Sequence, residues 1–187
     1  MVCTRVGYAG GTTNNPTYYN IGDHSETVQM DYDPARVSYE KLLDVFWNSH
    51  DPTFQQSLQQ YASIIFYHSE EQKRLAMESK QRVEARLGKE VFTEIIPVSK
   101  FYLAEDYHQK FYLQQTPELM KDVSAVYPKL EDFISSTAVA RLNGYAGGFG
   151  TVEGAKEQLN NLGLSEAGKE KLLQIAESGL IAACPAR

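Results

Sequence analysis

The sequence has little cysteine, no long apolar run and no excess of basic residues. It carries two cysteines in 187 residues, Cys3 and Cys184, too few for the disulfide framework of a small secreted scaffold. No apolar run approaches the roughly 20 residues that a membrane-spanning helix needs. Lys and Arg number 18 against 24 Asp and Glu, a formal charge of −6, which argues against a general nucleic-acid-binding protein. We therefore expect neither a membrane nor nucleic acid among its partners.

The residues that are present indicate a folded protein. Hydrophobic residues make up 42% of the chain and charged residues 22%, which excludes wholesale disorder. The length suits one domain, or one domain with an appendage, and can bury a core. No basic segment precedes an apolar one at the N-terminus, so no signal peptide is visible. We therefore expect a cytoplasmic protein, and a monomer.

The N-terminus begins directly with a strand pattern. Val2, Thr4 and Val6 lie at alternate positions, which predicts a strand over residues 2–8. A strand that begins at the second residue is unusual, because chain termini normally fray. Two interpretations stay open: an N-terminal strand without an arm, or a chain that begins inside a domain.

Strands dominate the first hundred residues, with two helices among them. Alternating apolar residues predict strands over 26–33, 61–67 and 91–98. Helical spacing and capping serines predict helices over 38–50 and 69–88. This order of elements is typical of the α+β class.

The character of the chain changes after residue 116. The segments from residue 117 onward have helical patterns, with glycine stops at Gly144, Gly163 and Gly179. We therefore predict an α+β core over residues 1–116 and a helical C-terminal extension over residues 117–187.

A short repeat links the two predicted parts. VGYAGG at 6–11 recurs as NGYAGG at 143–148, but the flanking residues differ. We interpret the repeat as coincidence or a reused turn, and not as a duplicated domain.

Metal and nucleotide sites find no support in the residue spacing. None of the four histidines, His24, His50, His68 and His108, pairs with another at the spacing of metal ligands. The glycine pairs lack the following lysine of a phosphate-binding loop. We expect no metal and no organic cofactor.

The long loop after the first strand gathers tyrosines and a carboxylate. Tyr18, His24 and Glu26 lie within residues 12–26, and Tyr61 opens a later predicted strand. A glutamate at a strand start is usually solvated, but a carboxyl group among aromatic rings is poorly solvated and stays protonated as an acid. Tyrosine hydroxyls can donate hydrogen bonds to an oxygen-bearing substrate. The residues alone leave both interpretations open.

Two polar segments have structural explanations. His50-Asp51-Pro52 is interpreted as a helix end with a proline stop, and residues 104–109 as a helix start with acidic residues favoured by the helix dipole. Each could also line a pocket.

Five strings occur in a fixed order and together are more specific than any one of them. They are RVGYAGGTTNNPTY (5–18), GDHSETVQMDYDP (22–34), SYEKLLDVFWNSHDPT (38–53), QYASIIFY (60–67) and FYLAEDYHQKFYL (101–113). Over roughly residues 2–115 the chain closely resembles the peptide methionine sulfoxide reductase A family.

The resemblance implies a two-layer α+β sandwich of ferredoxin-like type and a peptide-methionine (S)-S-oxide reductase that repairs oxidative damage. In this family a cysteine thiolate attacks the sulfoxide of free or protein-bound methionine, and a carboxylic acid protonates the departing oxygen. A thiol of the protein, or of a reductant such as thioredoxin or glutathione, then resolves the sulfenic acid. The family's acid falls on Glu26 and its two tyrosines on Tyr18 and Tyr61.

The chain departs from the family pattern at the nucleophile. The family's cysteine lies in a Gly-Cys-Phe-Trp motif upstream of RVGYAGG, and this sequence contains no such motif. Its only tryptophan, Trp47, belongs to a predicted helix, and Cys3 aligns to the second strand of the family. A cysteine on another strand is a weak candidate for a nucleophile that must reach acid and substrate.

Three further positions differ from the family. The family's aspartate in the loop before Tyr61 has no counterpart, and Gln56 is nearest by position. The resolving cysteine position is Ala146. Cys184 lies in the helical extension, either as a relocated resolving cysteine or as an ordinary tail cysteine.

Two hypotheses account for the missing nucleophile. In the first, the chain is an incomplete form of a working reductase that starts at an internal Met, for instance because a selenocysteine codon was read as a stop. In the second, it is a non-catalytic relative that binds oxidised methionine or a partner surface. The retained acid and tyrosines fit the first hypothesis better. Under both, we predict little or no activity for the 187 residues as written.

Overall fold

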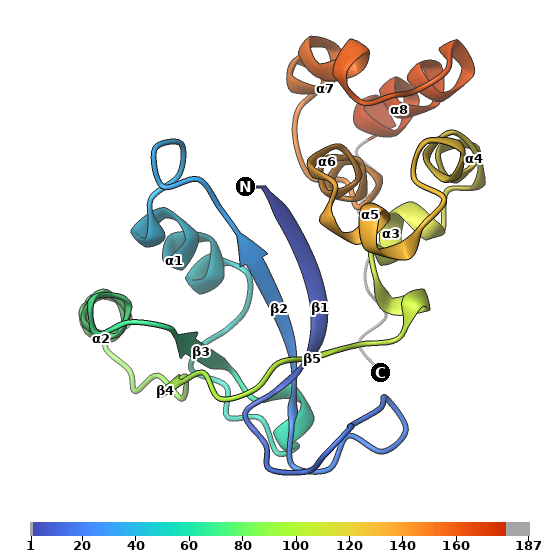
Figure 1. Cartoon of the computed structure of the whole chain (residues 1–187). Coiled ribbons are helices and arrows are strands. Elements are labelled where there is room, and N and C mark those ends of the chain that lie inside the picture. The colour runs from blue at the N-terminus through green and yellow to red at the C-terminus, as the bar shows by residue number, and fades with distance from the viewer. Residues whose placement is uncertain (1, 179–187) are drawn as a thin grey trace. The chain divides into compact units, whose positions relative to one another are not determined.

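The computed structural model describes residues 2–178, which divide into two compact units (Figure 1). One unit comprises Val6–Glu105 and mixes strands with helices. The other comprises residues 2–5 together with residues 106–178 and is mainly helical. The predicted boundary after residue 116 lies within this second unit and stays a prediction about domain organisation.

Two small sheets form the framework of the first unit, although the first three residues of β1 are assigned to the second unit. Strands β2 (Ser25–Asp31), β1 (Cys3–Ala9) and β5 (Tyr102–Leu103) make one sheet in the order β2-β1-β5. Strands β3 (Ile64–Tyr67) and β4 (Glu94–Pro97) make a parallel pair with Ile64 opposite Glu94. β2 and β3 are therefore end strands, each with a partner on one side only within the sheets described.

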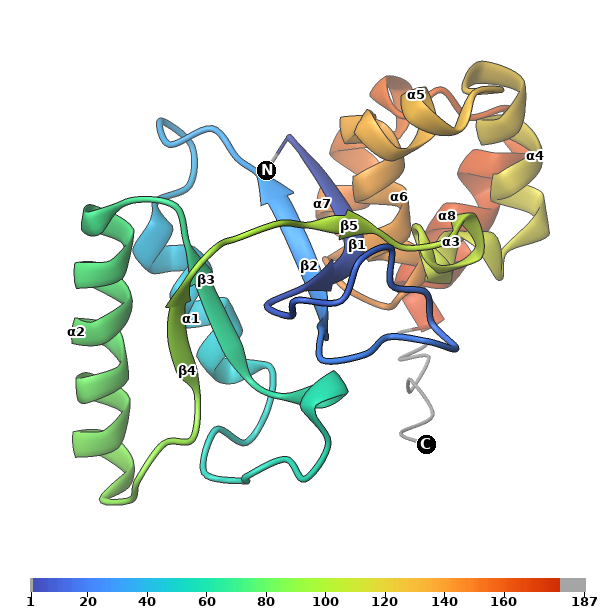
Figure 2. The same ribbon diagram turned by 60° about the horizontal axis from the view of Figure 1, so that its bottom comes forward.

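Two capped helices pack beside the β3-β4 sheet. Helices α1 (Tyr39–Asn48) and α2 (Glu70–Leu87) begin after Ser38 and Ser69, whose hydroxyls accept hydrogen bonds from the first-turn backbone as the sequence predicts. α2 runs alongside β3 and β4 in both views (Figure 2). The core between these elements consists of Leu43, Trp47, Ile65, Ala76, Val83 and Val91.

Short helices build the second unit. They are α3 (Phe111–Gln114), α4 (Pro117–Val126), α5 (Leu130–Ser135), α6 (Thr137–Ala146), α7 (Val152–Gln158) and α8 (Glu166–Ser178). Their apolar faces converge on a separate core whose fully buried members include Leu113, Leu119, Leu142 and Leu172. The helical prediction is thus confirmed over residues 117–178.

Two strand predictions were too long. Strand β3 begins at Ile64, because Tyr61 and Ala62 donate backbone hydrogen bonds within the 3₁₀ turn Gln59–Tyr61 instead of to a neighbouring strand. β4 begins at Glu94, since the Val91 amide is tied to the Glu84 side chain. In each case a local bond satisfies the backbone that a longer strand would have used.

One glycine stop was also wrong. Gly144 lies inside α6, which continues to Ala146, and a Cβ at Gly144 would meet nothing within 4 Å. Gly163 does stop the turn before α8, with a left-handed φ of 72°. Gly179 lies outside the described residues.

The chain mixes helix and strand, as expected for the α+β class. Across residues 2–178, every helix is too short or too polar to cross a bilayer.

Candidate functional site

Asp23 organises the long loop between β1 and β2. Its carboxylate accepts four hydrogen bonds, from the backbone amides and the hydroxyls of Thr12 and Thr13, at 2.8–3.0 Å. These bonds hold the pKa of Asp23 well below its usual range, with the Thr13 amide as the largest cause. The loop is therefore closed on itself by a charged anchor just before β2.

His24 forms a second anchor beneath the same loop. Its fully buried ring accepts a hydrogen bond from the Gly11 amide at Nδ1 (3.1 Å) and donates from Nε2 to the Thr13 carbonyl (2.7 Å). This pattern fits the neutral ring with the proton on Nε2. The ring also stands edge-on to Tyr102 of β5, so the loop is fixed to the sheet.

Glu105 holds the part of the loop that carries Tyr18. One carboxylate oxygen accepts a hydrogen bond from the Tyr18 amide (3.0 Å) and the other from the hydroxyl of Tyr8 on β1 (2.7 Å). The sequence predicts Glu105 in the first turn of a helix, where attraction to the helix dipole would account for an acidic residue. In the structure its carboxylate instead links β1 to the loop.

The loop and the turn bring the three predicted site residues together. Glu26 is the second residue of β2, Tyr18 comes from the loop, and Tyr61 ends the turn before β3. Loss of solvent, the charge of Glu26 and a hydrogen bond to the Tyr18 side chain raise the pKa of the Tyr61 hydroxyl. Tyr61 is 40% exposed and Tyr18 is partly buried.

Two glutamines join β2 to the turn that carries Tyr61. Gln60 donates from Nε2 to the Glu26 carboxylate at 2.6 Å. The Ser25 hydroxyl donates to the Gln59 carbonyl at 2.6 Å. The sequence analysis did not identify either glutamine, and the one available signal was their position directly before Tyr61.

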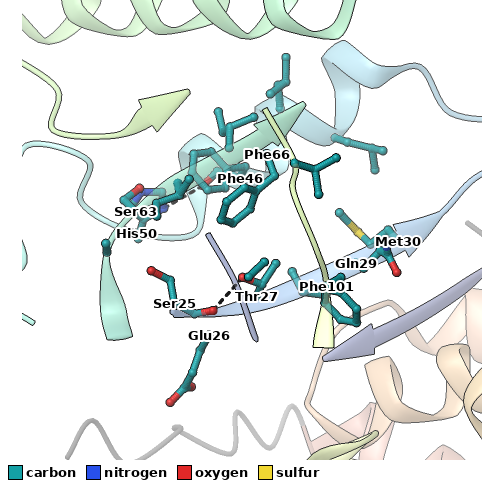
Figure 3. A pocket seen from close by; sticks show the side chains of 18 of the residues that line it. Ser25, Glu26, Thr27, Gln29, Met30, Phe46, His50, Ser63, Phe66 and Phe101 are labelled. Carbon is teal, nitrogen blue, oxygen red and sulfur yellow. Dashed lines mark hydrogen bonds between the residues drawn. The ribbon is translucent and has the colours of Figure 1, made fainter. Parts of the chain in front are cut away.

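Glu26 is exposed, which settles the question that the sequence left open about its solvation. Its carboxylate points away from Phe46 and Phe66 toward the rim of the site (Figure 3). Within the described residues the carboxyl group is therefore not enclosed by aromatic rings.

A groove of about 580 Å³ opens beside Glu26. Its lining includes residues of β2, β3 and α1, and the side chains are mainly apolar. Figure 3 shows Phe46 and Phe66 on one side of the open space and Thr27, Met30 and Phe101 on the other. The groove can therefore accept an apolar group next to a carboxylate and two phenols.

His50 and Asp51 line the groove and mainly stabilise the local structure. The His50 ring contacts the Phe46 carbonyl (3.0 Å) and the Ser63 hydroxyl (2.9 Å). Asp51 accepts hydrogen bonds from the amide and hydroxyl of Thr53, which lower the pKa of its carboxyl group. The structural interpretation of this segment is confirmed, and both residues also line the groove.

No cysteine of the described chain lies in the groove lining. Cys3 belongs to the helical unit, where it is 4% exposed and its sulfur accepts a hydrogen bond from Arg5 (3.4 Å). Cys184 lies outside the described residues. Over residues 2–178, no three His, Cys, Asp or Glu side chains are grouped as metal ligands would be.

Comparison with known sequences gives one consistent result. The sequence model of the family described as peptide methionine sulfoxide reductase matches residues 1–141. A peptide methionine sulfoxide reductase of Drosophila melanogaster is 43% identical over 164 residues, which cover 87% of this chain and 65% of the fly protein. Peptide methionine sulfoxide reductase A5 of rice is 44% identical over 78% of this chain and 59% of its own length. The chain thus spans less than two thirds of these curated relatives.

Solved structures agree with the sequences. Mxr1 from Saccharomyces cerevisiae in reduced form matches 62% of this chain and 71% of its own, with a TM-score of 0.56 and 31% identity. Methionine sulfoxide reductase A of Corynebacterium diphtheriae matches 62% of this chain and 64% of its own, with a TM-score of 0.51 and 30% identity. With a family model that covers most of its residues and relatives above 40% identity, the chain belongs to the peptide methionine sulfoxide reductase family.

Proposed function

We propose that the site at Glu26 binds methionine-S-sulfoxide, free or in proteins, and takes part in its reduction to methionine. The observation that carries the proposal is the meeting of Glu26, Tyr18 and Tyr61 beside an apolar groove. A sulfoxide presents a strongly accepting oxygen next to an apolar methyl group. Two hydroxyls and a carboxylic acid can donate hydrogen bonds to this oxygen, and the apolar groove can contact the methyl group.

Glu26 is the acid of the proposed reaction. A thiolate attacks the sulfoxide sulfur, Glu26 donates its proton to the oxygen, and Tyr18 and Tyr61 hold that oxygen by hydrogen bonds. The sulfur–oxygen bond of the sulfoxide breaks and methionine leaves. The thiol gains the oxygen as a sulfenic acid, so the sulfoxide is reduced by two electrons and the thiol is oxidised by two.

External thiols complete the proposed cycle. A first thiol displaces water from the sulfenic acid and forms a disulfide, and a second thiol reduces that disulfide. The reductant is of the thioredoxin or glutathione type, and the site residues require no metal or organic cofactor for these steps.

The attacking thiol comes, in this proposal, from outside the described residues. The groove lining contains no cysteine, and Cys3 is buried in the helical unit. The 187-residue chain therefore supplies the acid and the binding groups of the reaction. We further infer that the unit Val6–Glu105 belongs to the two-layer ferredoxin-like type, which is supported by α1 and α2 packing together beside the β3-β4 sheet.

An NMR titration tests the proposal without the need for turnover. The S and R epimers of N-acetylmethionine sulfoxide are added separately to the ¹⁵N-labelled chain. The S epimer should bind at least 5-fold more tightly and shift the amides of Glu26, Tyr18 and Tyr61. Equal affinity for both epimers, or shifts confined to other residues, would rule out this site.

A further inference from the structure

A second groove, which we call the α2-β4 groove, lies between helix α2 and strand β4. Its volume is about 650 Å³. It is lined from α2 by Met77, Lys80, Gln81 and Glu84 and from the chain before and within β4 by the successive residues 90–96. α2 runs alongside β4 in Figure 2. None of these residues lines the groove beside Glu26, so the two grooves are separate features of one unit.

The outer edge of β4 is protected against pairing with another strand. The Glu94 amide donates to the segment that leads into β3, and backbone alternation therefore turns the polar groups of Thr93 and Ile95 outward. Lys80 donates from Nζ to the Thr93 carbonyl at 2.8 Å, and Pro97 has no amide hydrogen to offer. An occupant of the α2-β4 groove therefore contacts it mainly through side chains, because too little of the edge is open for a ladder.

Apolar side chains on both sides of the α2-β4 groove are open to solvent. Met77 of α2 is 48% exposed and Phe92, from the opposite side, is 38% exposed. Ile95 and Ile96 of β4 are partly buried beside them. Because burial of apolar surface is favourable, this part of the lining can bind apolar side chains.

The charges of the lining are unbalanced. Glu84, Glu90 and Glu94 stand against a single cation, Lys80, which gives the lining a net charge of −2. Among the residues that the structure describes, no ion pair includes any of these three glutamates. Glu90 and Glu94 are exposed, so their carboxylates are available to a cationic partner.

Charge and size together decide which class of partner fits. Carboxylates repel phosphate groups, which argues against nucleic acid and against an anionic lipid surface. They attract the guanidinium group of arginine, which pairs with a carboxylate by two parallel hydrogen bonds. The volume of about 650 Å³ lies within the range of roughly 300–1,000 Å³ that is usual for ligand sites, so a few side chains fit and a whole domain face does not.

We propose that the α2-β4 groove binds a short segment of a partner protein in which arginines flank apolar residues. The apolar side chains are buried against Met77 and Phe92, and the arginines pair with Glu90 and Glu94. The occupant is not a second copy of this chain, whose charge of −6 opposes self-association. The proposal does not rest on the proposed function, because the two grooves share no lining residue.

An NMR titration of the ¹⁵N-labelled chain tests the proposal. The probe is the capped tetrapeptide Arg-Leu-Leu-Arg, and the control is capped Gln-Leu-Leu-Gln, which keeps the apolar residues and lacks the charges. The probe should shift amides within residues 77–84 and 90–96 and should bind about 5-fold more tightly than the control. This preference should shrink as the salt concentration rises from about 0.05 M to about 0.5 M, because salt screens exposed charges.

A matched pair of double variants locates the charged contacts. Glu90→Gln with Glu94→Gln removes two carboxylates from the lining and should weaken probe binding about 5-fold. Glu40→Gln with Asp44→Asn removes the same charge from exposed positions of α1 outside the lining, and should leave binding unchanged.

A second pair of variants locates the apolar contact. Met77→Gln should weaken the binding of both peptides about 3-fold, because both lose the same apolar surface. Val45→Gln changes a residue of α1 that is 61% exposed and outside the lining, and should weaken neither.

Several results would overturn the proposal. They are no binding of the probe, shifts confined to residues outside the lining, equal affinity for the two peptides, and equal losses in the two double variants. Capped arginine that binds as tightly as the probe would identify a small cation as the occupant. Shifts of the same amides that grow with protein concentration without peptide would identify a second copy.

Discussion

At the scale of single residues, the candidate site consists of two tyrosine hydroxyls and a carboxylate. Neighbouring side chains hold these residues in place by hydrogen bonds. Glu105 fixes the Tyr18 amide, and Gln60 donates to Glu26. The motifs singled out Glu26, Tyr18 and Tyr61 by resemblance, and the structure brings them together. Gln60 and Glu105 could not be identified in the same way, because their partners lie 34 and 87 residues away in the sequence.

Removal of the Tyr61 hydroxyl should weaken sulfoxide binding. Tyr61→Phe deletes one hydrogen bond to the sulfoxide oxygen, worth about 1 kcal/mol, so the affinity for the S epimer should fall about 5-fold in an NMR titration. Tyr19→Phe is the control, because Tyr19 adjoins Tyr18 but is 91% exposed. Equal losses in both variants would contradict the assigned role of Tyr61.

The role proposed for Glu26 predicts that its carboxyl group is needed to bind the sulfoxide oxygen. Glu26→Ala removes the group that donates to this oxygen, and one hydrogen bond is worth about 1 kcal/mol, so the affinity for the S epimer should fall about 5-fold. Glu40→Ala, an exposed change on α1, should leave the affinity unchanged, and an NMR titration measures both variants. Equal affinities in the two variants would contradict the role proposed for Glu26.

At the scale of elements, tertiary bonds override several local signals. The residues YAGG form the end of β1 and a bend at 8–11, but the end of α6 and a turn at 145–148. Helix caps were predictable because Ser38 and Ser69 act on residues three positions away. The first residues of β3 and β4 were not predictable, because they depend on hydrogen bonds made by neighbouring segments.

Loss of the His24 ring should destabilise the unit Val6–Glu105. His24→Ala removes two hydrogen bonds and a fully buried ring, at a cost of about 2–4 kcal/mol in the free energy of unfolding. Urea unfolding followed by tryptophan fluorescence reports on this unit, because the single tryptophan, Trp47, is buried in its core. The exposed His68→Ala should change stability by less than about 0.5 kcal/mol, and a similar loss in both would refute the anchor role.

The buried Lys110 predicts a pH-dependent stability of the helical unit. Its ammonium donates to the Thr4 carbonyl and hydroxyl and to the Ile134 carbonyl, and burial lowers its pKa to about 8 from 10.5. Between these values the unfolded chain binds the proton and the folded chain does not, so stability should rise with pH, by up to about 3 kcal/mol at pH 10.5.

Denaturation followed by circular dichroism from pH 7.5 to 10.5 measures this rise. Lys110→Met should abolish it, and Lys121→Met, a change at an exposed position of α4, should retain it. A flat profile in the unchanged chain would contradict the prediction.

At the scale of the whole molecule, the chain belongs to a reductase family but lacks that family's Gly-Cys-Phe-Trp motif. The described residues bring together a carboxyl group, two phenols and an apolar groove. No cysteine is among the described residues that line this groove. We therefore expect the 187 residues to recognise the sulfoxide more effectively than they reduce it.

Reduction of N-acetylmethionine-S-sulfoxide by the purified 187-residue chain, with dithiothreitol as the thiol donor, tests this account most directly. The account predicts S-selective binding with a rate of methionine formation close to that of dithiothreitol alone, unchanged by Cys3→Ser or Cys184→Ser. Clear turnover that either substitution abolishes would show that the chain contains its own nucleophile and would contradict the account.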